Sequence, residues 1–148
     1  MEPISDEPKT GLLSVSEVTP ETLAYVWTEI EPMVKRGLSH GQGDGTTSNH
    51  MLAAIAGGQM SLWVIHRGRE VVAGIVLSFS EHDVCKKLFV EMLAGKDMPV
   101  WADQLEGLLK DVKELIGATC IEASCRPGLA KFLSGRGWKE KAIVMEMK

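Results

Sequence analysis

The stretch from Lys86 to Trp138 constrains the fold more than any other part of the chain, because it predicts alternating strands and helices. Its long helix has apolar residues at helical spacing, follows Asp97 and Pro99, and ends at Gly117. Two strands that are joined by a helix pair in parallel through a right-handed crossover. The predicted elements of this β-α-β unit and its extension are strand 87–93, helix 101–116, strand 119–124 and helix 128–133.

The residues before this unit predict an antiparallel meander. Apolar runs at 62–66 and 71–79 flank the polar turn 67–70, which is a hairpin signal, and strand 87–93 continues the pattern. The predicted fold class is therefore α/β (α+β), with a mixed sheet and helices on both faces. Short strands are also expected at 12–15 and 142–147.

Two further helices are predicted before the meander. The first begins at Thr19-Pro20-Glu21, and Pro32 should kink or break it because proline lacks the N–H that a helix interior needs. The second is short, is capped by Thr47 or Ser48, and stops at Gly57-Gly58. A glycine-rich loop at 41–45 lacks the Gly-Lys-Ser/Thr ending of a nucleotide-triphosphate loop, so it is interpreted as a flexible lip.

Length and charge restrict the possible classes. The 148 residues predict one domain at 12–148, preceded by an extended polar arm at 1–11. A net charge of −4 gives no electrostatic attraction to nucleic acid or an anionic membrane. No apolar run approaches the ~20 residues of a spanning helix, and the acidic start is unlike a signal sequence, so a cytoplasmic location is expected. Three cysteines without a C-x-x-C pair predict reduced thiols.

The element order resembles the GNAT (GCN5-related N-acetyltransferase) fold, and several motifs are similar to small GNAT-like proteins of tailed bacteriophages, including the T7-type phages. Those motifs are Ser61-Leu62-Trp63-Val64, Leu93-Ala94-Gly95, Cys120-Ile121-Glu122, Arg126-Pro127-Gly128 and Gly135-Arg136-Gly137-Trp138.

The resemblance implies a place for acyl-CoA. In active GNAT enzymes the pyrophosphate rests on a glycine-rich loop at the start of the helix that follows the third meander strand. Here that segment contains one glycine, Gly95, and Asp97 brings negative charge to it. Pro99 removes one N–H donor and Trp101 is bulky, whereas Lys96 compensates in part. This segment therefore disfavours tight CoA binding.

Only some of the catalytic residues that the resemblance implies are present in this sequence. The tyrosine that the family often carries on its last short helix corresponds to Leu133, with Phe132 beside it, and the single tyrosine, Tyr25, belongs to the first helix. Glu91 and Glu122 are carboxylates within apolar strands, where partial burial would raise the pKa and suit either residue to deprotonate an amine. The alternative is that each carboxylate lies on a solvated face or pairs with a basic side chain; the candidates are Lys87, Arg126 and Lys131.

If the protein is an enzyme, the resemblance assigns the acyl-CoA contacts to the third meander strand and the loop after it. The residues so assigned are Phe89, Val90, Glu91, Met92, Leu93, Gly95 and Lys96. The histidines show no metal-ligand spacing, so no metal site is predicted. Trp101, Arg126 and Arg136 are the candidate residues of a protein contact surface, because exposed tryptophan and arginine are common in interfaces.

Two hypotheses follow. The favoured one is a non-catalytic bacteriophage GNAT-like protein without a cofactor, a virion-associated or assembly accessory factor. It would contact other phage structural or assembly proteins or a second copy of itself, in the host cytoplasm or in the virion. The alternative is an acyl-CoA-dependent N-acetyltransferase with an atypical pyrophosphate loop, which takes acetyl-CoA as substrate.

Overall fold

A computed structural model describes residues 12–39, 47–82, 85–125, 127–143, 145 and 147. The predicted arm at 1–11 and the glycine-rich loop at 41–45 lie outside the described residues. The elements, in chain order, are β1 (Ser14–Glu17), α1 (Pro20–Ser39), α2 (Ser48–Ala56), β2 (Ser61–Arg67), β3 (Glu70–His82), β4 (Cys85–Gly95), α3 (Met98–Ile116), β5 (Cys120–Ala123) and α4 (Pro127–Ser134).

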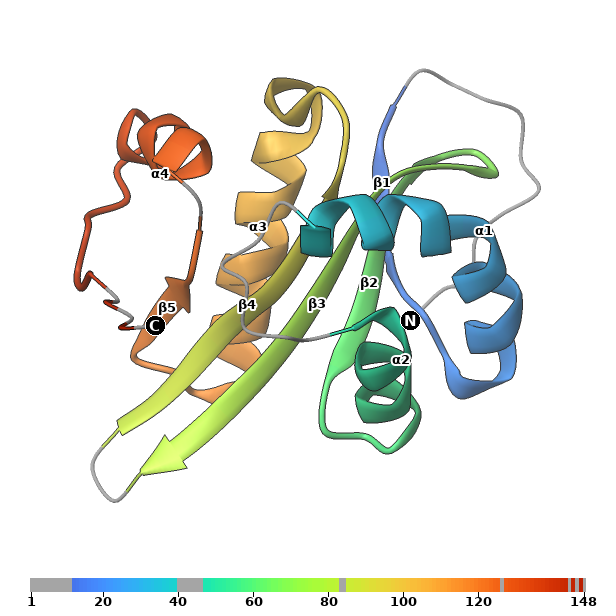
Figure 1. The fold of residues 1–148 in the computed structure, drawn as a ribbon, viewed down its shortest axis with the longest axis horizontal. Helices are drawn as coiled ribbons and strands as arrows, with labels where there is room; N and C mark the ends of the chain where they lie inside the picture. The colour runs from blue at the N-terminus through green and yellow to red at the C-terminus, as the bar shows by residue number, and fades with distance from the viewer. Residues whose placement is uncertain are drawn as a thin grey trace.

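The five strands form one sheet in sequence order (Figure 1). Strands β1 to β4 are antiparallel neighbours, and β5 pairs with β4 in parallel after the α3 crossover. This arrangement confirms the predicted meander, the β-α-β unit and the mixed sheet.

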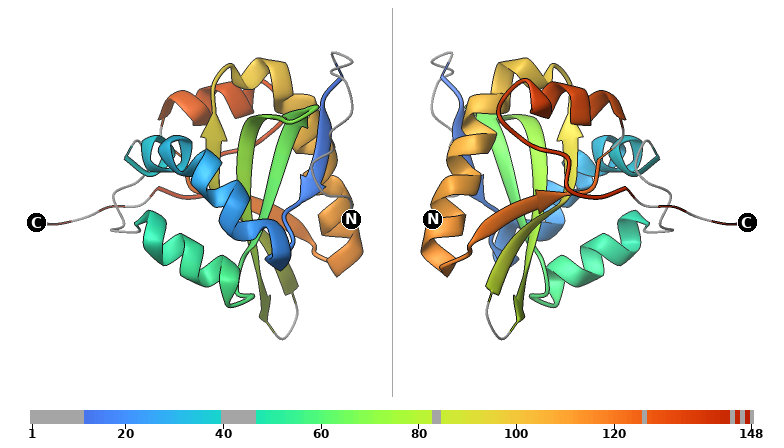
Figure 2. Two further views of the ribbon diagram at one scale, coloured as in Figure 1. Left: turned by 90° about the vertical axis from the view of Figure 1, so that its right-hand side faces the viewer. Right: turned by 90° about the vertical axis from the view of Figure 1, so that its left-hand side faces the viewer.

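Helices cover both faces of the sheet and bury two separate apolar cores (Figure 2). The first core packs α1 and α2 against one face, with Ile30, Val34 and Val76 at its centre. The second packs α3 against the other face, around Ile75 and Leu105. Successive strand residues point to opposite faces, so β3 supplies Val76 to one core and Ile75 to the other.

Local signals in the sequence set the helix ends. The Thr47 hydroxyl accepts a hydrogen bond from the His50 N–H at 3.2 Å and caps α2. Gly117 ends α3 with φ of 72°, a left-handed conformation that favours glycine, and its N–H bonds the Glu114 carbonyl. Helix α1 continues through Pro32 without a break, and Figure 1 shows that its axis changes direction between its two halves.

The last predicted strand, at 142–147, is wrong for the positions of this segment that the structure describes. Residues 142, 143, 145 and 147 are not in a strand. Ile143 and Met145 are 74% and 87% exposed. Alternating apolar residues give strand propensity, but a strand also needs a hydrogen-bonding partner, and among the described residues the sheet ends at β5.

Candidate active site where β4 and β5 diverge

The pairing between β4 and β5 covers only part of β4. It runs from Lys87 opposite Cys120 to Val90 opposite Ala123. Beyond Val90, β4 continues to Gly95 alongside β3 alone, while the chain leaves β5 toward α4 (Figure 1). The second half of β4 therefore presents one backbone edge that no neighbouring strand of the described sheet occupies.

A β-bulge interrupts β4 at this point. Met92 lies opposite Val76 and Val90 lies opposite Leu77, so Glu91 between them has no partner on β3. The bulge changes the facing of the side chains: Val90 packs in the core beneath α3, whereas Met92 packs in the core beneath α1. The predicted base Glu91 is thus the bulge residue, where the strands separate.

Glu91 is exposed, so the predicted partial burial is wrong for this residue and the alternative of a solvated face holds. Its carboxylate is held by a neighbouring side chain. The Ser78 hydroxyl donates a hydrogen bond of 2.6 Å to Glu91 Oε2. Ser78 follows Leu77, which faces the α3 core, so Ser78 and Glu91 lie on the face of the sheet that α1 and α2 partly cover. An oriented, solvent-accessible carboxylate at the divergence of two strands can accept a proton from a bound amine.

The surroundings of Glu122 differ from those that the sequence predicted. Lys87 Nζ lies 2.9 Å and Lys141 Nζ 2.8 Å from the same oxygen, Glu122 Oε1. The hydrogen bonds from Lys141 and then Lys87 lower the pKa of Glu122, which outweighs the opposing effect of burial. The predicted rise in pKa is wrong for this residue, and the alternative pairing with Lys87 is confirmed.

The start of α3, where the resemblance assigns the pyrophosphate, has an unusual backbone. Asp97 has φ of 56° and makes no side-chain hydrogen bond to the helix. Gly95 has φ of 151°, and a Cβ at this position would lie 2.8 Å from the Val72 carbonyl oxygen. Pro99 lacks an N–H and the Val100 N–H bonds the Asp97 carbonyl, so two donors of the first turn are not available to a ligand.

Trp101 does not crowd this helix start. Its side chain is 2% exposed and packs in the α3 core, and its indole Nε1–H donates to the Lys96 carbonyl at 2.8 Å. The expectation of an exposed Trp101 is therefore wrong, because the first turn of α3 directs this residue toward the sheet. The indole instead fixes the loop that carries Lys96 and Asp97, both of which are exposed.

Arg136 forms ion pairs within the domain. Its guanidinium bonds the Glu106 carboxylate at 2.8 Å and also contacts Asp103, both on α3, and its pKa is raised by these two carboxylates. Trp138 Nε1–H donates to Glu106 at 3.3 Å. These bonds attach the chain after α4 to α3, which leaves less of Arg136 for a partner protein. Arg126, the third predicted contact residue, lies outside the described residues.

Leu133 and Tyr25 belong to the helices that the sequence predicted for them. Leu133 is 4% exposed and fills the position where the family often has tyrosine, while Tyr25 is 73% exposed on α1.

In the described part of the chain, no group of three His, Cys, Asp or Glu side chains is arranged to hold a metal ion. No helix in the described ranges is long and apolar enough to span a bilayer.

The structure adds pairs that sequence reasoning missed. Ser78 and Lys141 contact the two predicted carboxylates, but they are 13 and 19 residues away from them in the chain. The register between β3 and β4 brings Ser78 to Glu91, and the path of the chain after α4 brings Lys141 to Glu122. A further pair, Ser16 and His66, is joined by a 2.9 Å hydrogen bond and is 6% and 4% exposed. Its burial makes it a structural contact between β1 and β2.

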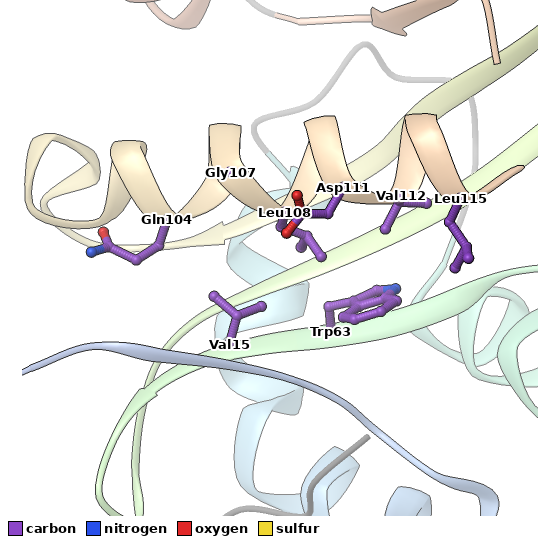
Figure 3. A pocket seen from close by; sticks show the side chains of 8 residues that line it. All are labelled: Val15, Trp63, Gln104, Gly107, Leu108, Asp111, Val112 and Leu115. Carbon is purple, nitrogen blue, oxygen red and sulfur yellow. The ribbon is translucent and has the colours of Figure 1, made fainter. Parts of the chain in front are cut away.

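A cavity of about 350 Å³ lies elsewhere, between α3 and the strands β1 and β2 (Figure 3). Figure 3 shows Val15 and Trp63 facing Leu108 and Val112 across it. None of its lining residues is a predicted site residue. It is on the α3 face of the sheet, opposite to the face that carries Glu91.

Comparison with known proteins supports the fold. No protein-family profile matches the sequence, and no curated protein matches it. An aminoglycoside acetyltransferase, meta-AAC0020, from an uncultured soil metagenomic sample matches with a TM-score of 0.69 at 9% identity, over 94% of this chain and 97% of that one. Glucosamine-6-phosphate N-acetyltransferase from Arabidopsis thaliana matches with a TM-score of 0.64 at 12% identity, over 93% and 98%.

A predicted acetyltransferase from Clostridium acetobutylicum, whose structure includes acetyl-CoA, matches with a TM-score of 0.65 at 8% identity, over 93% of this chain and 96% of that one. Identities this low establish a shared fold and no more. The resemblance to bacteriophage proteins stays a prediction, because none of these comparisons bears on it. The chain has the GNAT acetyltransferase fold.

Proposed function

We propose that this protein is an acyl-CoA-dependent N-acyltransferase in which Glu91 is the general base. The observation that carries the proposal is the position of the Glu91 carboxylate, held by Ser78 at a β-bulge where β4 parts from β5. The fold is shared with acetyltransferases, one of which is bound to acetyl-CoA, and this favours the enzyme over a non-catalytic protein.

In the proposed reaction, the pantetheine arm of the substrate lies along the backbone of the assigned stretch of β4, Phe89 to Leu93, on the part of its edge beyond Val90 that β5 leaves unpaired. Glu91 accepts a proton from the acceptor amine. The amine nitrogen then forms a bond to the thioester carbonyl carbon and the carbon–sulfur bond breaks, releasing the CoA thiolate and an amide. Leu133 cannot donate a proton, so the thiolate takes its proton from solvent.

The loop at the start of α3 is suited to moderate affinity for the diphosphate. The Trp101 side chain is buried in the α3 core and does not crowd the loop, and the ammonium of Lys96 offsets the Asp97 carboxylate. Fewer N–H donors are available than in a glycine-rich loop because of Pro99.

A titration calorimetry experiment with acetyl-CoA tests the proposal. We expect saturable binding, with a rise in melting temperature that corresponds to about 2.7 kcal/mol of added stability at 100 times Kd. Glu91→Gln keeps the acceptor atom for the Ser78 hydroxyl but removes the base, so it should lower kcat by about 10²- to 10⁴-fold while Kd for acetyl-CoA stays unchanged. Glu114→Gln, an exposed carboxylate of α3, is the matched control.

A second candidate function is the non-catalytic contact protein. The acidic, donor-poor start of α3 at Asp97 and Pro99 favours it. It predicts no binding and no thermal shift at millimolar CoA, together with co-sedimentation with phage structural components. That combination of results would refute the enzyme proposal.

A further inference from the structure

A polar strip lies on the open part of the sheet next to Glu91. Lys87 and Phe89 alternate with the buried residues Leu88 and Val90, so both point to the face opposite α3. The bulge residue Glu91 lies on the same face, where Ser78 bonds its carboxylate. Glu122 lies opposite Phe89 and points to the same face. On this face α1 packs against β4 beyond Glu91, at Met92 and Ala94, and Figure 1 shows α2 nearer to β2.

The charges of this strip are separated. Glu91 is at one end, and two ammonium groups, those of Lys87 and Lys141, meet at Glu122 Oε1 toward the other end. Two cations around one carboxylate leave a net local charge of +1. An ammonium group has three N–H donors, and Glu122 Oε1 engages one from each lysine, so an incoming anion can bind to others.

Between the two ends lie an apolar side chain and a polar one. The Phe89 ring is half-buried between Glu91 and Lys87 and offers an apolar surface. Ser80, which is opposite Lys87, has a buried hydroxyl oxygen without a hydrogen-bond partner among the described residues.

The strand geometry gives the separation of the two ends. The ammonium groups lie at the level of Glu122 and Phe89, two residues along β4 from Glu91 and one strand across. At ~3.3 Å per residue and ~4.8 Å between strands, the distance is roughly 8 Å.

We infer that the acceptor substrate is an amine that carries an anionic group, a carboxylate or a phosphate, about 7–8 Å from its nitrogen. Its amine faces Glu91, its apolar middle lies on Phe89, and its anion binds Lys87 and Lys141. This inference rests on the proposed function, because it assigns the acceptor of the same site. It selects against polycationic amines, which the lysine pair repels.

Three amines of equal chain length test the inference: 5-aminopentanoate, 5-amino-1-pentanol and 1,5-diaminopentane. Acetyl transfer from acetyl-CoA is followed by thiol release. Binding of each amine to the protein is measured separately by NMR amide shifts of β3, β4 and β5. We expect 5-aminopentanoate to have the highest kcat/KM and to be bound most tightly, with 1,5-diaminopentane the weakest.

Lys141→Gln isolates the charge. Its side chain is 62% exposed, so the change should not disturb folding. We expect the KM for 5-aminopentanoate to rise about two- to fivefold with kcat unchanged, the KM for 5-amino-1-pentanol to stay constant, and Lys141→Arg to restore wild-type behaviour. Lys139→Gln removes the same charge from the same segment and serves as the matched control.

The outcomes separate the two proposals. Equal kcat/KM for the three amines, or a preference for 1,5-diaminopentane, overturns the anionic acceptor and leaves the acyltransferase intact. If no amine is acetylated, the proposed function fails, and the NMR titration still decides whether the strip prefers 5-aminopentanoate. Equal shifts with all three amines in that case overturn the inference as well.

Discussion

The orientation of the proposed base depends on one contact, the hydrogen bond from the Ser78 hydroxyl. Its 2.6 Å bond to Glu91 Oε2 links β3 to the bulge of β4. Glu91 is exposed, so without this bond its side chain can rotate among several rotamers.

Ser78→Ala should therefore lower kcat by about tenfold and leave the Kd for acetyl-CoA unchanged, because a mispositioned base costs more in the transition state than in binding. Steady-state kinetics and calorimetry measure the two quantities. Ser78→Thr, which keeps the hydroxyl and suits a strand, should retain most of the activity. Full activity in Ser78→Ala would contradict a positioning role.

The free energy of unfolding should depend on pH through the ionisation of Glu122. Its pKa is lower in the folded protein than its ordinary value of 4.5, since Lys141 and Lys87 favour the charged carboxylate. The unfolded chain then binds a proton more readily than the folded one. The stabilisation is present above pH 4.5 and is lost as the pH falls through the folded pKa.

In urea denaturation, the difference in unfolding free energy between the wild type and Glu122→Gln should be greatest near pH 7 and should shrink below pH 4.5. Glu114→Gln, a control without this pair of lysines, should show no such trend. A difference that is constant from pH 7 to pH 3 would contradict the assignment of the two ion pairs.

The start of α3 is the element whose properties most affect CoA binding. Asp97 combines a left-handed φ of 56° with a negative charge at the positive end of the helix dipole. Its charge repels a diphosphate, whereas its conformation is one that asparagine and glycine adopt more readily than other residues.

Asp97→Asn keeps the side-chain shape and removes the charge, so it should tighten acetyl-CoA binding by about threefold to tenfold. Calorimetric titration at low ionic strength measures the gain, and added salt should reduce the difference. Asp111→Asn, at an exposed position further along the same helix, is the control. Asp103 is not used because it contacts Arg136. Unchanged affinity in Asp97→Asn would show that the diphosphate does not approach this turn.

At the scale of the whole molecule, two cores share one sheet. Strand β3 places Val76 in the α1 core and Ile75 in the α3 core, so loss of either core leaves the same strand half-packed. The two halves should therefore unfold together.

Ile30→Ala in the α1 core and Leu105→Ala in the α3 core should each lower the free energy of unfolding by about 2–5 kcal/mol, because both side chains are 1% exposed. Far-ultraviolet circular dichroism and tryptophan fluorescence should report a single, coincident transition in each variant. Two separate transitions would show that the cores fold independently.

The local pattern of the chain was enough to predict most of the elements. Apolar residues at helical spacing predicted α3, and the glycine at position 117 predicted its end, because both depend on neighbouring residues. The β-α-β order predicted the parallel pairing of β4 and β5, since the crossover connection allows one arrangement. Glu91 was found because a charged residue within an apolar strand is conspicuous.

What surrounds each candidate residue was decided by tertiary structure alone. The bulge at Glu91 depends on the register between β3 and β4, and Lys141 reaches Glu122 from a segment beyond α4. Trp101 is buried because the turn at Asp97 directs the first turn of α3 toward the sheet. Residue type and spacing set local conformation, whereas register, facing and ion pairing are free energies of contacts between residues distant in the sequence.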